Sequence, residues 1–266
     1  MHFLEQRIYS LKLFIYFVLA LVFGGYTAYA FSNPIDDVCP QHVVWGAPKI
    51  QQEGANQYLC RTGYAVNYNY RTKVAYYVVE TIKPENLVRS AARKDDFRED
   101  PEVPAPYRAT LKDYVGSGLD RGHMAPAADF MNSERMMSES FYLTNMMPQV
   151  PGNNRGIWKY TEEMTRYYAQ KYGQIYVITG TIFDANSKTF GNNVYIPSYL
   201  YKIVIDAKNR RTISFLYPNV KLDPKTINQY VVSIADIERY TGIDFSPALP
   251  VELKAMETTK AIYEDW

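Results

Sequence analysis

The pattern of apolar and polar positions along the chain predicts several strands and two longer helices. A β-branched and aromatic run at 74–82 ends in Lys83-Pro84, which is typical of a strand that stops at a turn. Apolar positions recur with helical spacing at 155–172 and again at 233–240. Because strands and helices alternate without a βαβ rhythm, we expect one α+β domain from about residue 43 to residue 266. Further strands are predicted at 141–147, 175–183, 195–205 and 212–217.

The first 30 residues have the pattern of a secretory signal peptide. Arg7 and Lys12 precede an apolar run at 13–25, and Ala28-Tyr29-Ala30 provides a small-x-small cleavage site. The run has 13 residues, whereas a membrane span needs about 20. We therefore expect cleavage after Ala30, a mature chain of residues 31–266 with no stable membrane association, and a secreted or periplasmic location. An uncleaved membrane anchor is the alternative.

The chain has two cysteines, Cys39 and Cys60, and export determines how they are interpreted. In an oxidising compartment we expect the two thiols to form a disulfide near the start of the mature chain. Two unrelated free thiols are the alternative. Two cysteines are too few for a cysteine-based zinc cluster, and neither has an evident base nearby in the sequence that would indicate a catalytic thiol.

The composition is that of a globular protein, with charge that is balanced over the chain but not within it. Hydrophobic residues make up 47% and charged residues 21%, which argues against disorder, and the formal net charge is +1. Basic residues outnumber acidic ones seven to two at 61–94 and six to two at 202–225. These two segments either line a groove for phosphates or form solvated strand faces.

Three short segments carry the residue types that phosphate chemistry needs. They read DRGHMAP at 120–126, NMMPQ at 145–149 and NRGIW at 154–158. If Asn154 is the N-cap of a helix, residues at a spacing of four form one stripe with an amide, a carboxylate and a guanidinium, which suit a hard cation and a phosphate. The alternative is an exposed helix face with an ordinary ion pair. The stripe consists of Asn154, Trp158, Glu162 and Arg166.

The ordered set of DRGHMAP, NMMPQ and NRGIW followed by Glu162 resembles the DNA/RNA non-specific endonucleases of the ββα-metal superfamily. That family includes secreted bacterial nucleases and mitochondrial endonuclease G. The resemblance runs from about residue 61 to residue 250 and includes the segment 236–245. It implies a single ββα-metal nuclease domain, with a central and mainly antiparallel sheet and flanking helices. It also implies Mg²⁺ as cofactor, with Mn²⁺ as a substitute, DNA and RNA as substrates, and 5′-phosphate products.

The resemblance assigns roles to four residues. His123, the last residue of DRGH, matches the general base that activates the attacking water. Asn154 matches the one side chain that ligates the magnesium ion. Glu162 matches an acidic residue that holds the hydrated metal through its waters. Arg166 matches a phosphate-contacting arginine.

The roles of the remaining arginines of the site are assigned from the sequence next to them. Arg121, with Asp120, opens the DRGH signature and is expected to set its loop and contribute to catalysis. For an upstream arginine of the family we choose Arg93, with Arg98 as the rival, because the local sequence allows a gap of a few residues.

The residues themselves agree with phosphodiester hydrolysis. A neutral imidazole, with an ordinary pKa near 6.5, can accept a proton from water near neutrality. Two other functions stay open: a phosphodiesterase for small esters or nucleotides, and an inactive polyanion-binding domain. A serine hydrolase is unsupported because the chain has no G-x-S-x-G motif. His42, the other histidine of the mature chain, is expected to be structural, and the sequence specifies no oligomeric state.

Overall fold

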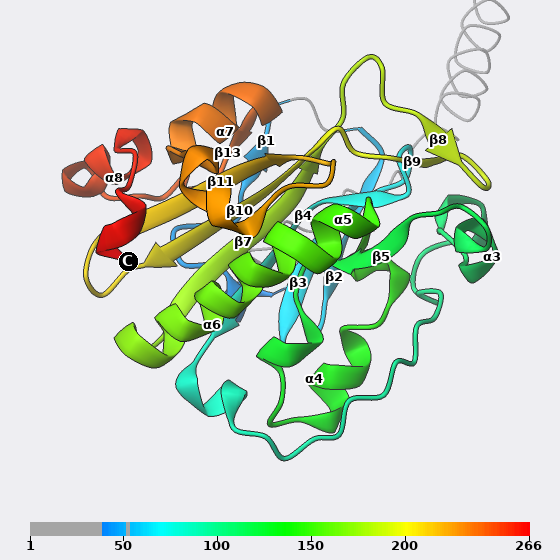
Figure 1. Ribbon diagram of the computed structural model, residues 1–266, viewed down its shortest axis with the longest axis horizontal. Helices are drawn as coiled ribbons and strands as arrows, with labels where there is room; N and C mark the ends of the chain where they lie inside the picture. Colours follow the sequence, from blue (N-terminus) through cyan, green and yellow to red (C-terminus); the bar gives the residue numbers. More distant parts are fainter. Residues whose placement is uncertain (1–38, 52–53) are drawn as a thin grey trace, which may run out of the picture. The chain divides into compact units, whose positions relative to one another are not determined.

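A seven-stranded antiparallel sheet organises the fold in the structure, a computed structural model that describes residues 39–51 and 54–266 (Figure 1). The predicted signal peptide lies outside the described residues and stays a prediction. Within the described part of the chain, no helix is long and apolar enough to cross a membrane. The strands, in their order across the sheet, are β12 (Val231–Val232), β11 (Arg211–Pro218), β10 (Tyr199–Asp206), β7 (Ile175–Ile182), β4 (Val74–Ile82), β3 (Tyr64–Asn69) and β2 (Asn56–Cys60).

The central strands are buried on both faces, which explains why they read as nearly continuous apolar runs. Val177 of β7 packs in one core cluster and its neighbour Ile178 in the other. The strand predicted at 74–82 is confirmed with the same bounds, and those at 175–183 and 212–217 are confirmed to within one residue at each end. The strand predicted from residue 195 begins later, at Tyr199.

Helical elements cover both faces of the sheet. A ribbon of three consecutive helical segments runs across the face of Val177: α5 (Pro151–Asn153), the π-helical turn η6 (Asn154–Trp158) and α6 (Lys159–Tyr172) (Figure 1). The other face is covered by α7 (Ile234–Thr241), whose Ser233 accepts a hydrogen bond from the Asp236 backbone as the N-cap. The helix predicted at 233–240 is thus confirmed.

The expectation that Asn154 is an N-cap is wrong. The ribbon already begins at Pro151, a residue that is favoured in the first helical turn because its fixed φ suits the helix. The ribbon is irregular inside: Gly156 has non-helical angles of φ −106° and ψ −112°. Asn154 therefore lies within the helical ribbon, one turn after its start.

The strand predicted at 141–147 is also wrong for most of its length. Residues Leu143–Asn145 form a 3₁₀ turn (η5), and only then does the short strand β6 (Met146–Gln149) begin. The Asn145 side-chain amide connects this turn to backbone groups outside the predicted strand. It donates to the carbonyls of Ser140 and Ala125 and accepts from the Ala125 N–H.

Shorter elements complete the described chain. The β-pairs outside the main sheet are β5 (Asp120–His123) with β6, β1 (Lys49–Ile50) with β13 (Ile243–Asp244), and β8 (Thr189–Phe190) with β9 (Val194–Tyr195). The short helices are α3 (Leu111–Tyr114), α4 (Glu134–Glu139) and α8 (Ala255–Thr258). The 3₁₀ turns are η1 (Pro40–His42), η2 (Pro84–Leu87), η3 (Ala105–Tyr107), η4 (Ala127–Asp129), η7 (Pro224–Tyr230), η8 (Val251–Leu253) and η9 (Tyr263–Asp265).

A disulfide joins Cys39 to Cys60, as expected from the sequence. It links the segment before η1 to the last residue of the edge strand β2, across a sequence separation of 21 residues. The Cys39 side chain is fully buried in the core cluster beside α7. The bond therefore fixes the start of the described chain to the sheet.

The double variant Cys39→Ser/Cys60→Ser should lower the free energy of unfolding by about 3 kcal/mol, because a disulfide that closes a loop of this length restricts the unfolded chain. Urea unfolding of both proteins under non-reducing conditions measures the difference. The untreated wild-type protein should also be two hydrogens lighter than its reduced form. Equal midpoints for the two proteins would contradict the prediction.

Candidate active site

The DRGH segment forms β5, a four-residue strand that pairs antiparallel with β6. Its register places Asp120 opposite Gln149 and His123 opposite Met146. Gly122 is required here because a Cβ at this position would collide with the Gln149 side chain. A pair of such short strands is marginal alone, so its position depends on what it packs against.

The helical ribbon holds both ends of β5. At one end, Asp120 accepts hydrogen bonds from Asn154 Nδ2 at 2.9 Å and from Arg155 Nε and Nη2 at 2.8 and 2.7 Å. At the other end, Trp158 Nε1 donates to the His123 carbonyl at 3.3 Å. Against the effect of burial, the bonds from Arg155 and Asn154 lower the pKa of Asp120, which keeps this carboxylate charged.

A cavity of about 720 Å³ opens beside this junction and brings the predicted site residues together. Arg98 does not line it: this side chain pairs with Asp96 at 2.9 Å and lies 4.0 Å from the centre of the Tyr142 ring. Of the two rival upstream arginines, the structure places Arg93 in the cavity. The predicted residues in its lining are Arg93, Arg121, His123, Asn154, Glu162 and Arg166.

Trp158 departs from the predicted stripe. Its side chain is fully buried in the core and does not line the cavity, because the ribbon turns irregularly between Asn154 and Trp158. The other three members, Asn154, Glu162 and Arg166, do share the cavity. The Trp158 side chain instead donates its hydrogen bond to the backbone of β5, at the His123 carbonyl.

Most of the positive charge of the cavity comes from outside the two basic segments identified in the sequence. Of the residues at 61–94 and 202–225, all of which the structure describes, only Arg93 lines it. Arg61 is buried in an ion pair with Asp100 at 2.5 Å, and Lys202 is buried in the core. Arg93 is thus the one cation that these segments contribute to the cavity, and Lys221 lines a neighbouring pocket that shares Arg155 with it. The cationic lining consists of Arg93, Arg121, Arg155, Lys159 and Arg166.

His123 is buried, and its ring packs edge-on against Phe141, with 5.0 Å between ring centroids. No group in the described part of the chain makes a hydrogen bond to its buried Nε2. Burial, together with the charges of Arg93 and Arg121 and against that of Asp95, lowers the pKa of His123 to about 3. The imidazole is therefore neutral near pH 7, the form that can accept a proton.

Glu162 and Arg166 lie next to two buried charged residues, Asp129 and Lys202. Arg166 donates to Asp129 at 2.9 Å, and the Asp129 side chain is only 2% exposed. Burial raises the pKa of Glu162 to about 7, although Lys202 and Arg166 favour its charged form. Because the shift keeps this carboxyl near its midpoint at neutral pH, a nearby cation would favour its ionised form.

Two buried residues of this region were not identified from the sequence. Lys202 of β10 donates to Thr179 Oγ1 at 2.6 Å and to the Met124 carbonyl at 3.4 Å, directly after His123. Glu80 of β4 is 1% exposed, and neither carboxylate oxygen has a hydrogen-bond partner among the described residues. An isolated lysine or glutamate within an apolar strand pattern was the only signal available for either.

The side chains of Asn154 and Glu162 fit a hard divalent cation. A carboxylate accepts hydrogen bonds only, so Asn154 turns its Nδ2 toward Asp120 and keeps its amide oxygen for another partner. Glu162 lines the same cavity. An amide oxygen with a carboxylate is the type of ligand set that Mg²⁺ takes while keeping several of its waters.

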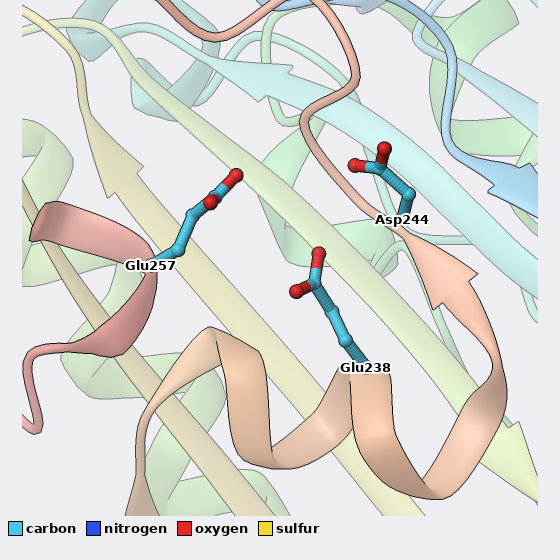
Figure 2. A group of neighbouring side chains, drawn as sticks. All are labelled: Glu238, Asp244 and Glu257. Atoms are coloured by element: carbon cyan, nitrogen blue, oxygen red, sulfur yellow. The ribbon is translucent and has the colours of Figure 1, made fainter. Parts of the chain in front are cut away.

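A second acidic group lies elsewhere, where α7, β13 and α8 meet (Figure 2). The carboxylate oxygens of Glu238, Asp244 and Glu257 lie within 4.8 Å of one another. Each already has a structural role: Glu238 accepts from the Phe245 N–H, Asp244 from the Ser246 N–H, and Glu257 from the Ser246 hydroxyl. These bonds hold the loop after β13 in place.

His42 lies apart from the cavity lining. It is buried, and its Nε2 lies 3.3 Å from the Arg61 carbonyl. This position agrees with the structural role expected for it.

His123→Asn should reduce the dependence of stability on pH. The folded His123 stays neutral down to about pH 3, whereas the unfolded residue binds a proton near pH 6.5, so acidification between these values favours the unfolded chain. The slope from this one group approaches about 1.4 kcal/mol per pH unit, and the variant lacks it. Urea unfolding at several pH values from 4 to 7 measures both proteins.

His42→Asn is the matched control for that experiment. Burial lowers the pKa of His42 as well, with hydrogen bonds to Arg61 and Thr62 opposing the shift, so this variant should keep the slope due to His123. Stability curves for His123→Asn and wild type that stay parallel from pH 4 to 7 would contradict a lowered pKa of His123 in the folded protein.

Known proteins are similar to this chain along most of its length. Residues 46–252 match the family described as DNA/RNA non-specific endonuclease. The chain is 35% identical over 215 residues to nuclease C1 of Cunninghamella echinulata var. echinulata, covering 74% of this chain and 85% of the relative. It is 36% identical over 210 residues to human mitochondrial endonuclease G, covering 73% and 71% of the two chains.

A solved structure is similar in three dimensions as well. A chain in the crystal structure of the EndoG/EndoGI complex has a TM-score of 0.71 and 28% identity, covering 79% of this chain and 91% of that one. The two short strands β5 and β6 and the helical ribbon that follows them are the ββα unit expected from the resemblance. The chain belongs to the DNA/RNA non-specific endonuclease family and has the fold of its ββα-metal nucleases.

Proposed function

We propose that this protein is an exported, Mg²⁺-dependent endonuclease that hydrolyses phosphodiester bonds of DNA and RNA with little sequence specificity. The observation that carries the proposal is the cavity, whose lining brings a neutral His123 together with Asn154, Glu162 and a set of cationic side chains. These are the groups that in-line hydrolysis of a phosphodiester requires.

In this mechanism the neutral imidazole of His123 accepts the proton of the attacking water. Arg93, Arg121 and Arg166 bind the non-bridging oxygens of the scissile phosphate, where charge accumulates during the displacement. Asp129 orients Arg166 through its 2.9 Å ion pair. Because these cations contact phosphates and no base edge, cleavage has little sequence preference.

Asn154 and Glu162 would hold the Mg²⁺ ion, with Mn²⁺ as a substitute. Bound there, the ion supplies Lewis acidity that stabilises the leaving 3′ oxygen. Asp120 fixes the Asn154 amide so that its oxygen serves as the ligand. Glu162 favours the hydrated ion through its charge.

Export is supported by two features. The apolar run at 13–25 with its small-residue cleavage site is typical of a secretory signal, whereas mitochondrial transit peptides are amphipathic and rich in arginine. The disulfide Cys39–Cys60 is typical of proteins that reside in an oxidising compartment. We therefore propose a secreted or periplasmic location, although mitochondrial nucleases are among the relatives.

His123→Ala should lower kcat on plasmid DNA and on RNA by a factor of about 10² to 10⁴, the usual effect of losing a positioned general base. His42→Ala, the matched control, should stay within a few-fold of wild type because it lies outside the cavity. Circular dichroism must show that both variants are folded. A folded His123→Ala variant that cleaves at the wild-type rate would exclude the proposed base.

Removal of the metal should abolish cleavage, and Asn154→Ala should need more metal to act. Wild-type activity is expected to disappear in excess chelator and to return when Mg²⁺ or Mn²⁺ is added. Asn154→Ala should be severely impaired at low Mg²⁺ and partly recover at high Mg²⁺, since the side chain mainly holds the ion. Titration of Mg²⁺ against the plasmid cleavage rate of both proteins measures this. Full activity in chelator would show that the enzyme is not metal-dependent.

A further inference from the structure

The cavity has an apolar rim that the catalytic groups leave unused. Four lining side chains come from α3 and the loop between α3 and β5, and together we call them the rim: Leu111, Tyr114, Val115 and Leu119. Val115 is 81% exposed and Leu111 37%, so two aliphatic side chains lie open to solvent at the edge of a cavity whose charged lining is mainly cationic.

The rim is held firmly in place. Asp113 caps α3 through the Thr110 N–H and also accepts a hydrogen bond at 2.6 Å from the Asn192 N–H, in the turn between β8 and β9. Tyr114 packs edge-on against Phe190 of β8, with 5.1 Å between ring centroids. These contacts tie α3 to a separate hairpin, so the exposure of Val115 is a fixed feature of the fold.

The loop after α3 turns tightly and leaves Val115 at its tip. Gly116 and Gly118 adopt positive φ values of 71° and 73°, which favour glycine. Between them, Ser117 donates from its hydroxyl to the Tyr114 carbonyl and accepts from the Leu119 N–H. The backbone polar groups of the turn are thus used locally, and the aliphatic side chain is presented outward.

A nucleic acid strand has the same two chemical faces as this cavity. Its phosphates are anionic, and the sugars and base faces beside them are largely apolar. The cationic side chains of the cavity suit the phosphates, and the rim offers an apolar surface to the sugars and base faces. An aliphatic surface packs against any base without reading hydrogen-bonding edges, which agrees with low sequence specificity.

We propose that the rim is the nucleoside subsite of the enzyme: Val115 and Leu111 pack against the base and sugar next to the scissile phosphate. This inference rests on the proposed function and specifies which part of the substrate occupies this wall. The rim determines affinity for base-containing strands, while the arginines hold the phosphate. Chemistry at the phosphorus therefore does not depend on the rim.

The test compares a base-containing single-stranded oligonucleotide with an abasic one that has the same number of phosphates. Val115→Ser should raise KM for the base-containing strand about tenfold, because an apolar contact of one side chain is lost, and change kcat less than twofold. KM for the abasic strand should change less than twofold. Val251→Ser is the matched control, because Val251 is 85% exposed and lies outside the cavity lining.

Each outcome decides the inference. An equal rise in KM for both strands, or no rise for either, would overturn it, and an unchanged melting temperature confirms that the variant is folded. Fluorescence anisotropy of the two oligonucleotides with His123→Ala, and with His123→Ala/Val115→Ser, makes the same comparison without turnover. If the wild type cleaves nothing, the proposed function fails, while the binding comparison still tests the subsite.

Discussion

The active site depends on one junction, where the helical ribbon holds the strand β5. Asp120 accepts from Asn154 and Arg155 at one end of this strand, and Trp158 donates to the His123 carbonyl at the other. The bonded residues are 34 or 35 positions apart in the sequence. A four-residue strand that pairs with one other short strand has little stability of its own, so these bonds define where the imidazole and the amide lie relative to one another.

Burial at this junction shifts the pKa values of two titrating groups in opposite directions, and both shifts favour the neutral form. His123 loses its solvent shell beside Arg93 and Arg121, so its pKa falls to about 3 and it stays neutral. Glu162 is also desolvated, but its pKa rises to about 7. The same low-dielectric environment thus leaves the imidazole neutral near pH 7 and the Glu162 carboxyl near its titration midpoint.

The sequence predicted the central sheet well and the site incompletely, for physical reasons. Strands buried on both faces, such as β4 and β7, have apolar runs as long as the strand itself, so their bounds are readable. The segment at 141–147 is equally apolar, but residues 143–145 form a 3₁₀ turn whose Asn145 amide bonds the backbone of Ser140 and Ala125, and the pattern of apolar positions carries no sign of that. The summed charge at 61–94 and 202–225 did not identify most of the cations that line the cavity, because it ignores which face a strand residue occupies: Lys202 is buried in the core.

The motif residues could be identified from the sequence because their spacing is contained in a short stretch of the chain. Other parts of the site depend on contacts between residues that are far apart in the sequence. His123, Asn154, Glu162 and Arg166 lie on the ββα unit, and a short window contains their spacing. Lys202 reaches the Met124 carbonyl across a separation of 78 residues. The rim gains its position from the 79-residue separation between Asp113 and Asn192. The rim lies on α3 and the loop after it, whereas His123, Asn154 and Glu162 lie on the ββα unit, so the contacts that position those three side chains do not involve the rim.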